Sequence, residues 1–109
     1  MLIALEDDGC LHVYESPEAA AMAIEGLDAE TTFRAVFDEN AVPYQVQWLT
    51  PNTEHRLLGT IRVVGSGRYA LVPAGPADRH AFLALFSSAR GPIPSEASSA
   101  LAVLTTHPG

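Results

Sequence analysis

The sequence predicts a single α+β domain, in which an antiparallel sheet of five to six strands carries helices packed on one face. Two observations support this prediction. Apolar and polar residues alternate in short segments that turn sequences join in pairs, as in strands with one buried face. Other segments carry apolar residues at helical spacing, which gives the order ββ-α-ββ-ββ-α-α over the 109 residues. Because strands joined by tight turns pair antiparallel, the helices are expected to form a second layer.

The first predicted hairpin turns at Gly9. A three-residue loop that ends at Gly9 in the left-handed conformation pairs Leu5 with Leu11 and Ile3 with Val13. A two-residue loop instead mixes polar and apolar side chains on both faces. Since a slip of one residue moves every side chain to the other face, the hydrophobic pattern favours the three-residue loop.

A helix is predicted to begin at Ser16. Ser16 is a good N-cap, Pro17 suits the first helical position, and Glu18 complements the positive end of the helix dipole. Gly26 or Asp28 is expected to mark the end of this helix. Its apolar stripe consists of Ala20, Ala23, Ile24 and Leu27.

Residues 32–49 form the second predicted hairpin. A four-residue loop at 38–41 brings all the apolar residues of both strands to one face. Pro43 cannot donate to a sheet ladder, which indicates either an edge or an irregular start of its strand. The expected cross-strand pairs are Phe37 with Val42, Ala35 with Tyr44, and Phe33 with Val46.

Gly65, Ser66 and Gly67 form the turn of a third predicted hairpin, between residues 58–64 and 68–72. A helix is then expected over residues 77–89, and Gly91 with Pro92 ends it. Ser95 is the predicted cap of a short last helix, and residues 105–109 are expected to form a frayed tail. The apolar stripe of the helix over 77–89 consists of Phe82, Leu85, Phe86 and Ala89.

The cysteine content and the lack of long apolar segments predict the compartment of the protein. Cys10 is the single cysteine, so no internal disulfide can form. Residues 1–8 show no secretory signal, and no apolar run approaches the ~20 residues that cross a bilayer. We therefore expect one domain over residues 1–109, located in the cytoplasm and without a membrane partner.

The negative charge is concentrated in the first 40 residues. They hold ten carboxylates against Arg34 alone, whereas the whole chain has a net charge of −7. Nucleic acid is a poor partner for such a chain because its phosphates would be repelled. A basic protein is the better electrostatic match.

Catalytic chemistry has little support in the sequence. The four histidines are scattered, and no pair has metal-ligand spacing. Ser66 lies between two predicted strands rather than between a strand and a helix, so it is not a nucleophile elbow. We therefore expect no catalytic residue, metal or cofactor. A small enzyme that uses Cys10, activated by His12, or a turn carboxylate is kept as an alternative.

Part of the chain resembles small bacterial immunity proteins, which neutralise polymorphic toxins delivered by contact-dependent or type VI secretion systems. The segments that carry the resemblance are 13–20, 24–30 and 33–38, and a looser match runs through 71–76. The similarity covers roughly residues 10–50. It implies a cytoplasmic, non-catalytic protein that binds a cognate toxin domain and blocks its active site.

The acidic first 40 residues would suit a basic, nuclease-like toxin. Because hairpin tips protrude, the expected contact residues are those of the two acidic turns: Glu6, Asp7, Asp8, Asp38 and Glu39. A regulatory or homodimerising module is the other binding hypothesis. It rests on the edge that Pro43 indicates and on the ribbon over 57–73, whose two faces are both apolar.

Overall fold

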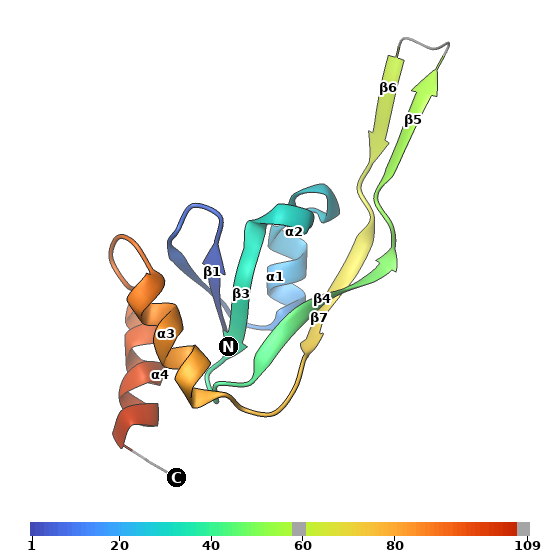
Figure 1. Cartoon of the computed structure of the whole chain (residues 1–109). Coiled ribbons are helices and arrows are strands. Elements are labelled where there is room, and N and C mark those ends of the chain that lie inside the picture. Colours follow the sequence, from blue (N-terminus) through green and yellow to red (C-terminus); the bar gives the residue numbers. More distant parts are fainter. Residues whose placement is uncertain (58–60, 107–109) are drawn as a thin grey trace.

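The computed structural model describes the backbone of residues 1–57 and 61–106, and the side chains of these residues outside 54–64. Strands and helices of this part follow in the predicted order of an α+β protein (Figure 1). The strands are β1 (Leu2–Glu6), β2 (Leu11–Tyr14), β3 (Phe33–Asp38), β4 (Pro43–Thr50), β5 (Thr53–Leu57), β6 (Ile61–Gly65) and β7 (Arg68–Pro73). The helices are α1 (Pro17–Ala23), α2 (Gly26–Thr32), α3 (Arg79–Ser88) and α4 (Ser95–Thr106).

The main sheet has five antiparallel strands in the order β2-β1-β3-β4-β7. Strands β5 and β6 form a separate two-stranded sheet, which continues the β4–β7 ribbon away from the helices (Figure 1). The molecule is consequently elongated, with extents of 61 × 27 × 20 Å. None of the helices in the described ranges is long and apolar enough to cross a membrane.

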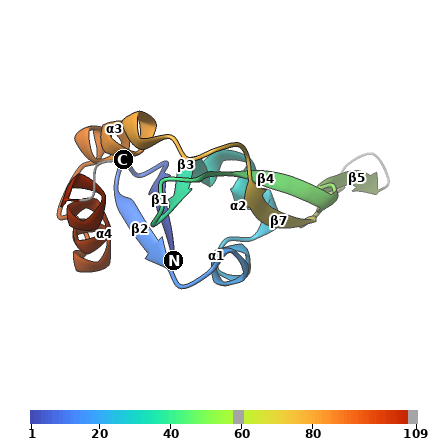
Figure 2. The ribbon, with the colours of Figure 1, turned by 90° about the horizontal axis from the view of Figure 1, so that it is seen from below.

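Helices cover both faces of the sheet, so the prediction of helices on one face is wrong. Leu2 and Ala4 of β1 pack in a core with α1 and α2, whereas Ile3 and Leu5 pack in a second core with α3 and α4. In Figure 2, β1 and β2 lie between the α3–α4 pair and α1. The sequence contained the signal, because an uninterrupted apolar run at residues 1–5 is typical of a strand buried on both faces.

The first hairpin has the predicted register. Leu5 lies opposite Leu11 and Ile3 opposite Val13. Gly9 ends the loop with a φ of 82°, a conformation that favours glycine. A side chain at Gly9 would also be crowded, because a Cβ there would lie 3.0 Å from Cδ of Arg90.

The predicted first helix starts as expected but is broken into two. Ser16 Oγ accepts a hydrogen bond from the backbone N–H of Ala19 at 3.0 Å, and Pro17 is the first helical residue. The helix α1 ends at Ala23, and Ile24 is extended. The Tyr69 hydroxyl donates to the Ile24 carbonyl at 2.7 Å, so a distant side chain stabilises the break.

The new helix α2 starts where two glycines meet. A Cβ on Gly26 would lie 2.3 Å from the carbonyl oxygen of Gly67, so only glycine permits this approach. Leu27, which was expected on the stripe of the first helix, belongs to α2 and is exposed. The break was not visible in the sequence, because the residues that cause it lie more than 40 positions further along the chain.

The second hairpin has a different register from the predicted one. Phe37 pairs with Pro43 and Val36 with Tyr44. The Asp38 N–H also donates to the Val42 carbonyl at 2.9 Å, so the loop is 39–41, one residue shorter than expected. Ala41 ends this loop with a φ of 65°, although alanine rarely adopts that conformation. The prediction failed because no glycine or asparagine stands at this position. Pro43 is the first residue of β4 and has a partner on both sides, so it marks the start of the strand, and β4 becomes an edge on its β3 side only after Tyr44.

The third predicted hairpin does not form. β6 pairs with β5, and β7 pairs with β4, so residues 61–64 and 68–72 are not partners. Residues 58–60 of that prediction lie outside the described residues. Gly65 is the last residue of β6, and Ser66 and Gly67 link the outer sheet to the main sheet. The Asn52 side-chain oxygen accepts there from the Gly67 N–H at 2.6 Å.

Both C-terminal helices lie where they were expected. Asp78 caps α3 by accepting from the Ala81 N–H at 3.0 Å, and Phe82 and Leu85 of α3 are buried. The helix α4 begins at Ser95 and continues to Thr106, so it extends two residues into the predicted tail. Residues 107–109 of that tail lie outside the described residues.

Candidate binding cleft

The two acidic turns lie at opposite ends of the sheet. β3 runs antiparallel to β1, with Asp38 opposite Leu2 and Phe33 opposite Glu6. The turn that holds Asp38 and Glu39 is therefore at the N-terminal end of β1, and the Met1 ammonium lies 3.6 Å from Glu39 Oε1. The turn that follows Glu6 is at the other end. The structure does not bring the five predicted contact residues onto one surface.

Glu6 is buried and cannot be an exposed contact residue. Its side chain accepts a hydrogen bond at 2.5 Å from the hydroxyl of Tyr14, and the residue is 6% exposed. Burial and the neighbouring Glu6 carboxylate raise the pKa of Tyr14 above its ordinary value. The outward position predicted for hairpin tips applies to Asp7, Asp8 and Glu39, which are exposed.

Asp8 is engaged within its own turn. Its carboxylate accepts from the Cys10 N–H at 2.8 Å and lies 2.8 Å from Nε2 of His12. The Cys10 N–H and the His12 ring together lower the pKa of the Asp8 carboxyl. Within the described ranges, no three His, Cys, Asp or Glu side chains are grouped to hold a metal ion.

A hollow lies where β3 and β4 separate. These strands pair only at Val36–Tyr44 and Phe37–Pro43, after which β3 continues beside β1 and β4 beside β7. A bulge in the β1–β3 ladder leaves Arg34 as an extra residue in β3. Bulges bend a strand and increase its twist, which accounts for the turn of β3 away from β4. Figure 1 shows the two strands diverging from their common lower end.

The separation of the strands forms a cleft of about 330 Å³. Residues of both sheet faces line it, with Ala35 and Gln45 from one face and Val36 and Val46 from the other. This pattern is expected only if the cavity lies between the strands rather than on one face of the sheet. Its complete lining consists of Ala29, Glu30, Phe33, Arg34, Ala35, Val36, Tyr44, Gln45, Val46, Trp48 and Leu71.

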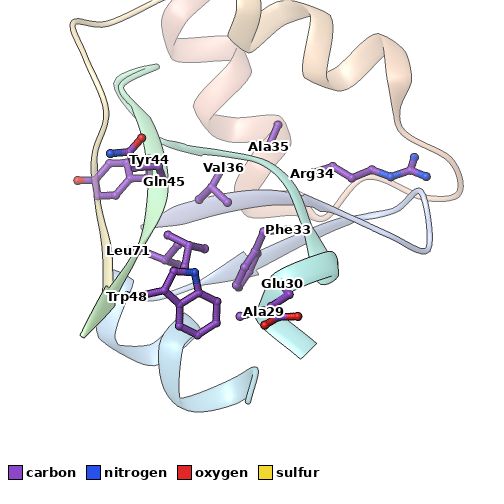
Figure 3. A pocket seen from close by; sticks show the side chains of 11 residues that line it. Ala29, Glu30, Phe33, Arg34, Ala35, Val36, Tyr44, Gln45, Trp48 and Leu71 are labelled. Carbon is purple, nitrogen blue, oxygen red and sulfur yellow. The ribbon is translucent and has the colours of Figure 1, made fainter. Parts of the chain in front are cut away.

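Aromatic side chains form one wall of the cleft. Phe33, Trp48 and Leu71 point toward a common centre in Figure 3. Behind them, the buried ring of Tyr69 lies 5.6 Å from Trp48 and 6.3 Å from Phe33, measured between ring centroids. Trp48 itself is 39% exposed, so a large apolar surface is open to a ligand. The predicted hairpin over residues 32–49 contains Trp48, but its alternation of apolar residues gives no sign that this ring is partly exposed.

The two charged side chains of the cleft, Glu30 and Arg34, point in different directions. Glu30, on α2, directs its carboxylate toward the Trp48 side of the cleft (Figure 3). One oxygen of Glu30 accepts from the side-chain amide of Asn52 at 2.7 Å, which positions the carboxylate. Arg34 lines the β3 side, but its guanidinium points away from Trp48 in the same view. The charge that faces a ligand beside Trp48 is therefore negative.

The sequence missed this site because two bulges create it. Neither the extra residue Arg34 in β3 nor Leu49, the extra residue in the β4–β7 ladder, interrupts the alternation of apolar residues recognisably. Trp48 is exposed because β3 and β4 separate beside it, and the residues that flank it in the sequence give no sign of this. Comparison with known proteins gives no further guide, since no protein-family model, curated protein or solved structure matches the chain.

Proposed function

We propose that this chain is an immunity or inhibitor protein, which binds a cognate bacterial toxin domain and blocks its active site. In this proposal the cleft between β3 and β4 is the centre of the contact surface. The single observation that carries it is the open, aromatic-walled cleft beside the exposed ring of Trp48. Tryptophan, with tyrosine and arginine, is enriched among the few residues that dominate protein–protein affinity.

The immunity resemblance and the cleft coincide in sequence. Every lining residue except Leu71 falls within residues 10–50, the region that carries the resemblance. The 11 residues that line the cleft are fewer than the about 20–30 residues that each partner of a typical interface contributes. The neighbouring β4–β7 ribbon, where Leu49 is exposed, extends the available surface. Steric coverage of the toxin requires no catalytic group in the inhibitor.

Electrostatic attraction supports the proposal only through the net charge of the chain, and not through one acidic contact surface as the sequence predicted. The acidic turns are at opposite ends, so they do not act as one contact surface. The net charge of −7 nevertheless attracts a basic protein over a distance of about 8–10 Å at physiological salt. Charge then contributes mainly to the rate of association, and the cleft contributes to the lifetime of the complex.

The proposal is tested by protection of cells from the toxin. The toxin domain encoded beside this chain is expressed in a sensitive host, with and without the chain, and survival is measured. Trp48→Ala is expected to weaken the purified complex at least about tenfold and to reduce protection. Ile93→Ala is the matched control, because Ile93 is 38% exposed and lies outside the cleft. Equal protection by the Trp48→Ala variant would place the contact surface elsewhere, and absence of protection by the wild type would exclude the function.

A further inference from the structure

We infer that the cleft binds an extended, basic segment of the partner as an added β-strand along β4. This inference rests on the proposed function only in taking the ligand to be a protein. It assigns the binding mode, the edge that is used and the charge of the segment. Three independent features of the cleft support it: unpaired backbone groups, spaced side-chain contacts and a negative wall.

The backbone of β4 has an open edge inside the cleft. The Ala74 N–H donates to the Pro43 carbonyl at 2.8 Å, so the backbone groups of Pro43 face β7. Because these groups alternate in direction along a strand, those of Val46 and Trp48 face the opposite side, toward β3. Pairing with β3 has already ended at Tyr44, and no other described strand pairs along that side. An extended peptide would supply the missing partners, which is strand addition.

Side chains of such a peptide would alternate between the two openings of the cleft. Phe33, Trp48 and Leu71 form an apolar hollow on the face of α1 and α2. On the other face, Gln45 is exposed and polar. Alternate positions of the bound segment would therefore be apolar or long-stemmed on one side and polar on the other.

The charge of the cleft favours a lysine or arginine in the segment. The Glu30 carboxylate, which accepts from Asn52, lines the same cleft as the Trp48 ring. A cation bound in the cleft could therefore meet both a carboxylate and an aromatic face. The guanidinium of Arg34 is directed away and does not oppose this charge. A second copy of this chain is a poorer occupant, because each copy carries a net charge of −7.

The test uses random ten-residue peptides displayed on phage, selected on the full-length chain and then synthesised. Peptides that bind are expected to carry lysine or arginine and to lose at least about tenfold in affinity on the Trp48→Ala variant. Glu30→Gln keeps an acceptor for Asn52 but removes the charge, and we expect a several-fold loss. Asp28→Asn is the matched control on the same helix and should bind as the wild type does.

Backbone pairing is tested on the same peptides by single N-methylation at each position in turn. Strand addition predicts that methyl groups at alternate positions abolish binding, while those between have little effect. A uniform response along the peptide, selection of acidic peptides, or recovery of no peptide sensitive to Trp48→Ala would each overturn the inference. A dimer in light scattering that Trp48→Ala dissociates would also overturn it, since a second copy would then fill the cleft.

The two proposals can fail separately. If the chain protects against the toxin but its cleft takes no peptide, the binding mode is wrong and the function stands. If basic peptides add to β4 but the chain gives no protection, the cleft is a peptide site that serves a different partner.

Discussion

The β1–β2 and β3–β4 hairpins are built on the same turn but differ in how far they stay paired. In each, the first residue of the turn accepts from the N–H three positions later: Gly9 donates to Glu6 at 3.0 Å, and Ala41 donates to Asp38 at 3.1 Å. The first hairpin pairs over the whole of β2. The second stays paired for only two residues of β4 before the strands separate.

The difference shows that a turn sets the register of a hairpin, whereas its surroundings set its length. β1 is buried on both faces by two helix pairs, and leaving its pairing would expose both cores. β4 also pairs with β7, so it keeps the backbone hydrogen bonds on that side where its pairing with β3 ends. The closed hairpin therefore contributes to stability, and the open one supplies a site. Four predictions test this comparison.

The largest expected effect is on the core between β1 and the helices α3 and α4, which also holds Phe37 and Ala41 at the paired end of the second hairpin. Phe82 is fully buried, and its ring lies 5.8 Å from that of Phe37 and 5.1 Å from that of Phe86. Phe82→Ala should lower the free energy of unfolding by about 3–5 kcal/mol, measured by urea denaturation. Trp48→Ala, in the open hairpin, should cost far less because its ring is partly exposed. Comparable losses for the two variants would contradict the division into a closed and an open hairpin.

A smaller effect is expected from the buried carboxylate of the first hairpin. Tyr14→Phe removes the hydroxyl that donates to Glu6 and leaves a buried acceptor unpaired. At neutral pH this should cost about 1–3 kcal/mol in the free energy of unfolding. Tyr44→Phe is the matched control on the open hairpin, since no hydrogen bond of the Tyr44 hydroxyl to a described residue is found. Its stability should change by less than about 0.5 kcal/mol.

The same pair predicts how stability depends on pH. The folded pKa of Tyr14 is raised above its ordinary value of 10.0 by burial and by Glu6. Its neutral form is therefore favoured by folding, and the resulting stability is complete below pH 10.0 and lost as the pH rises further. Denaturation midpoints of the wild type should fall above that pH, and those of Tyr14→Phe should fall less steeply. Equal slopes would mean that Tyr14 titrates normally.

The smallest effects are expected at the two turns themselves. Gly9→Ala puts a side chain into the left-handed region and against Arg90, and should cost about 1–2 kcal/mol. Ala41→Gly relieves the same strain but removes a buried methyl group, so the two effects nearly cancel. We expect the second variant to stay within about 0.5 kcal/mol of the wild type by urea denaturation. A large gain would show that the strain at Ala41 exceeds the value of its packing.

Local chemistry was enough to predict much of this fold from the sequence. The α+β class, the register of the first hairpin, the capped start of α1 at Ser16 and the positions of α3 and α4 all follow from groups within a few residues of one another. A glycine, a cap or an alternation of apolar residues acts at short range. Such features can be recognised in one sequence because nothing distant is needed to produce them.

The tertiary structure decided the features that depend on distant partners. The break at Ile24 needs Tyr69, 45 residues away, and the start of α2 needs the backbone of Gly67. The left-handed Ala41 is held by its burial in the core rather than by its residue type. The cleft exists because a bulge bends β3 away while β4 stays with β7. Long-range contacts of this kind override local preference, since the packing free energy that they supply exceeds the cost of about 1–2 kcal/mol for a strained residue.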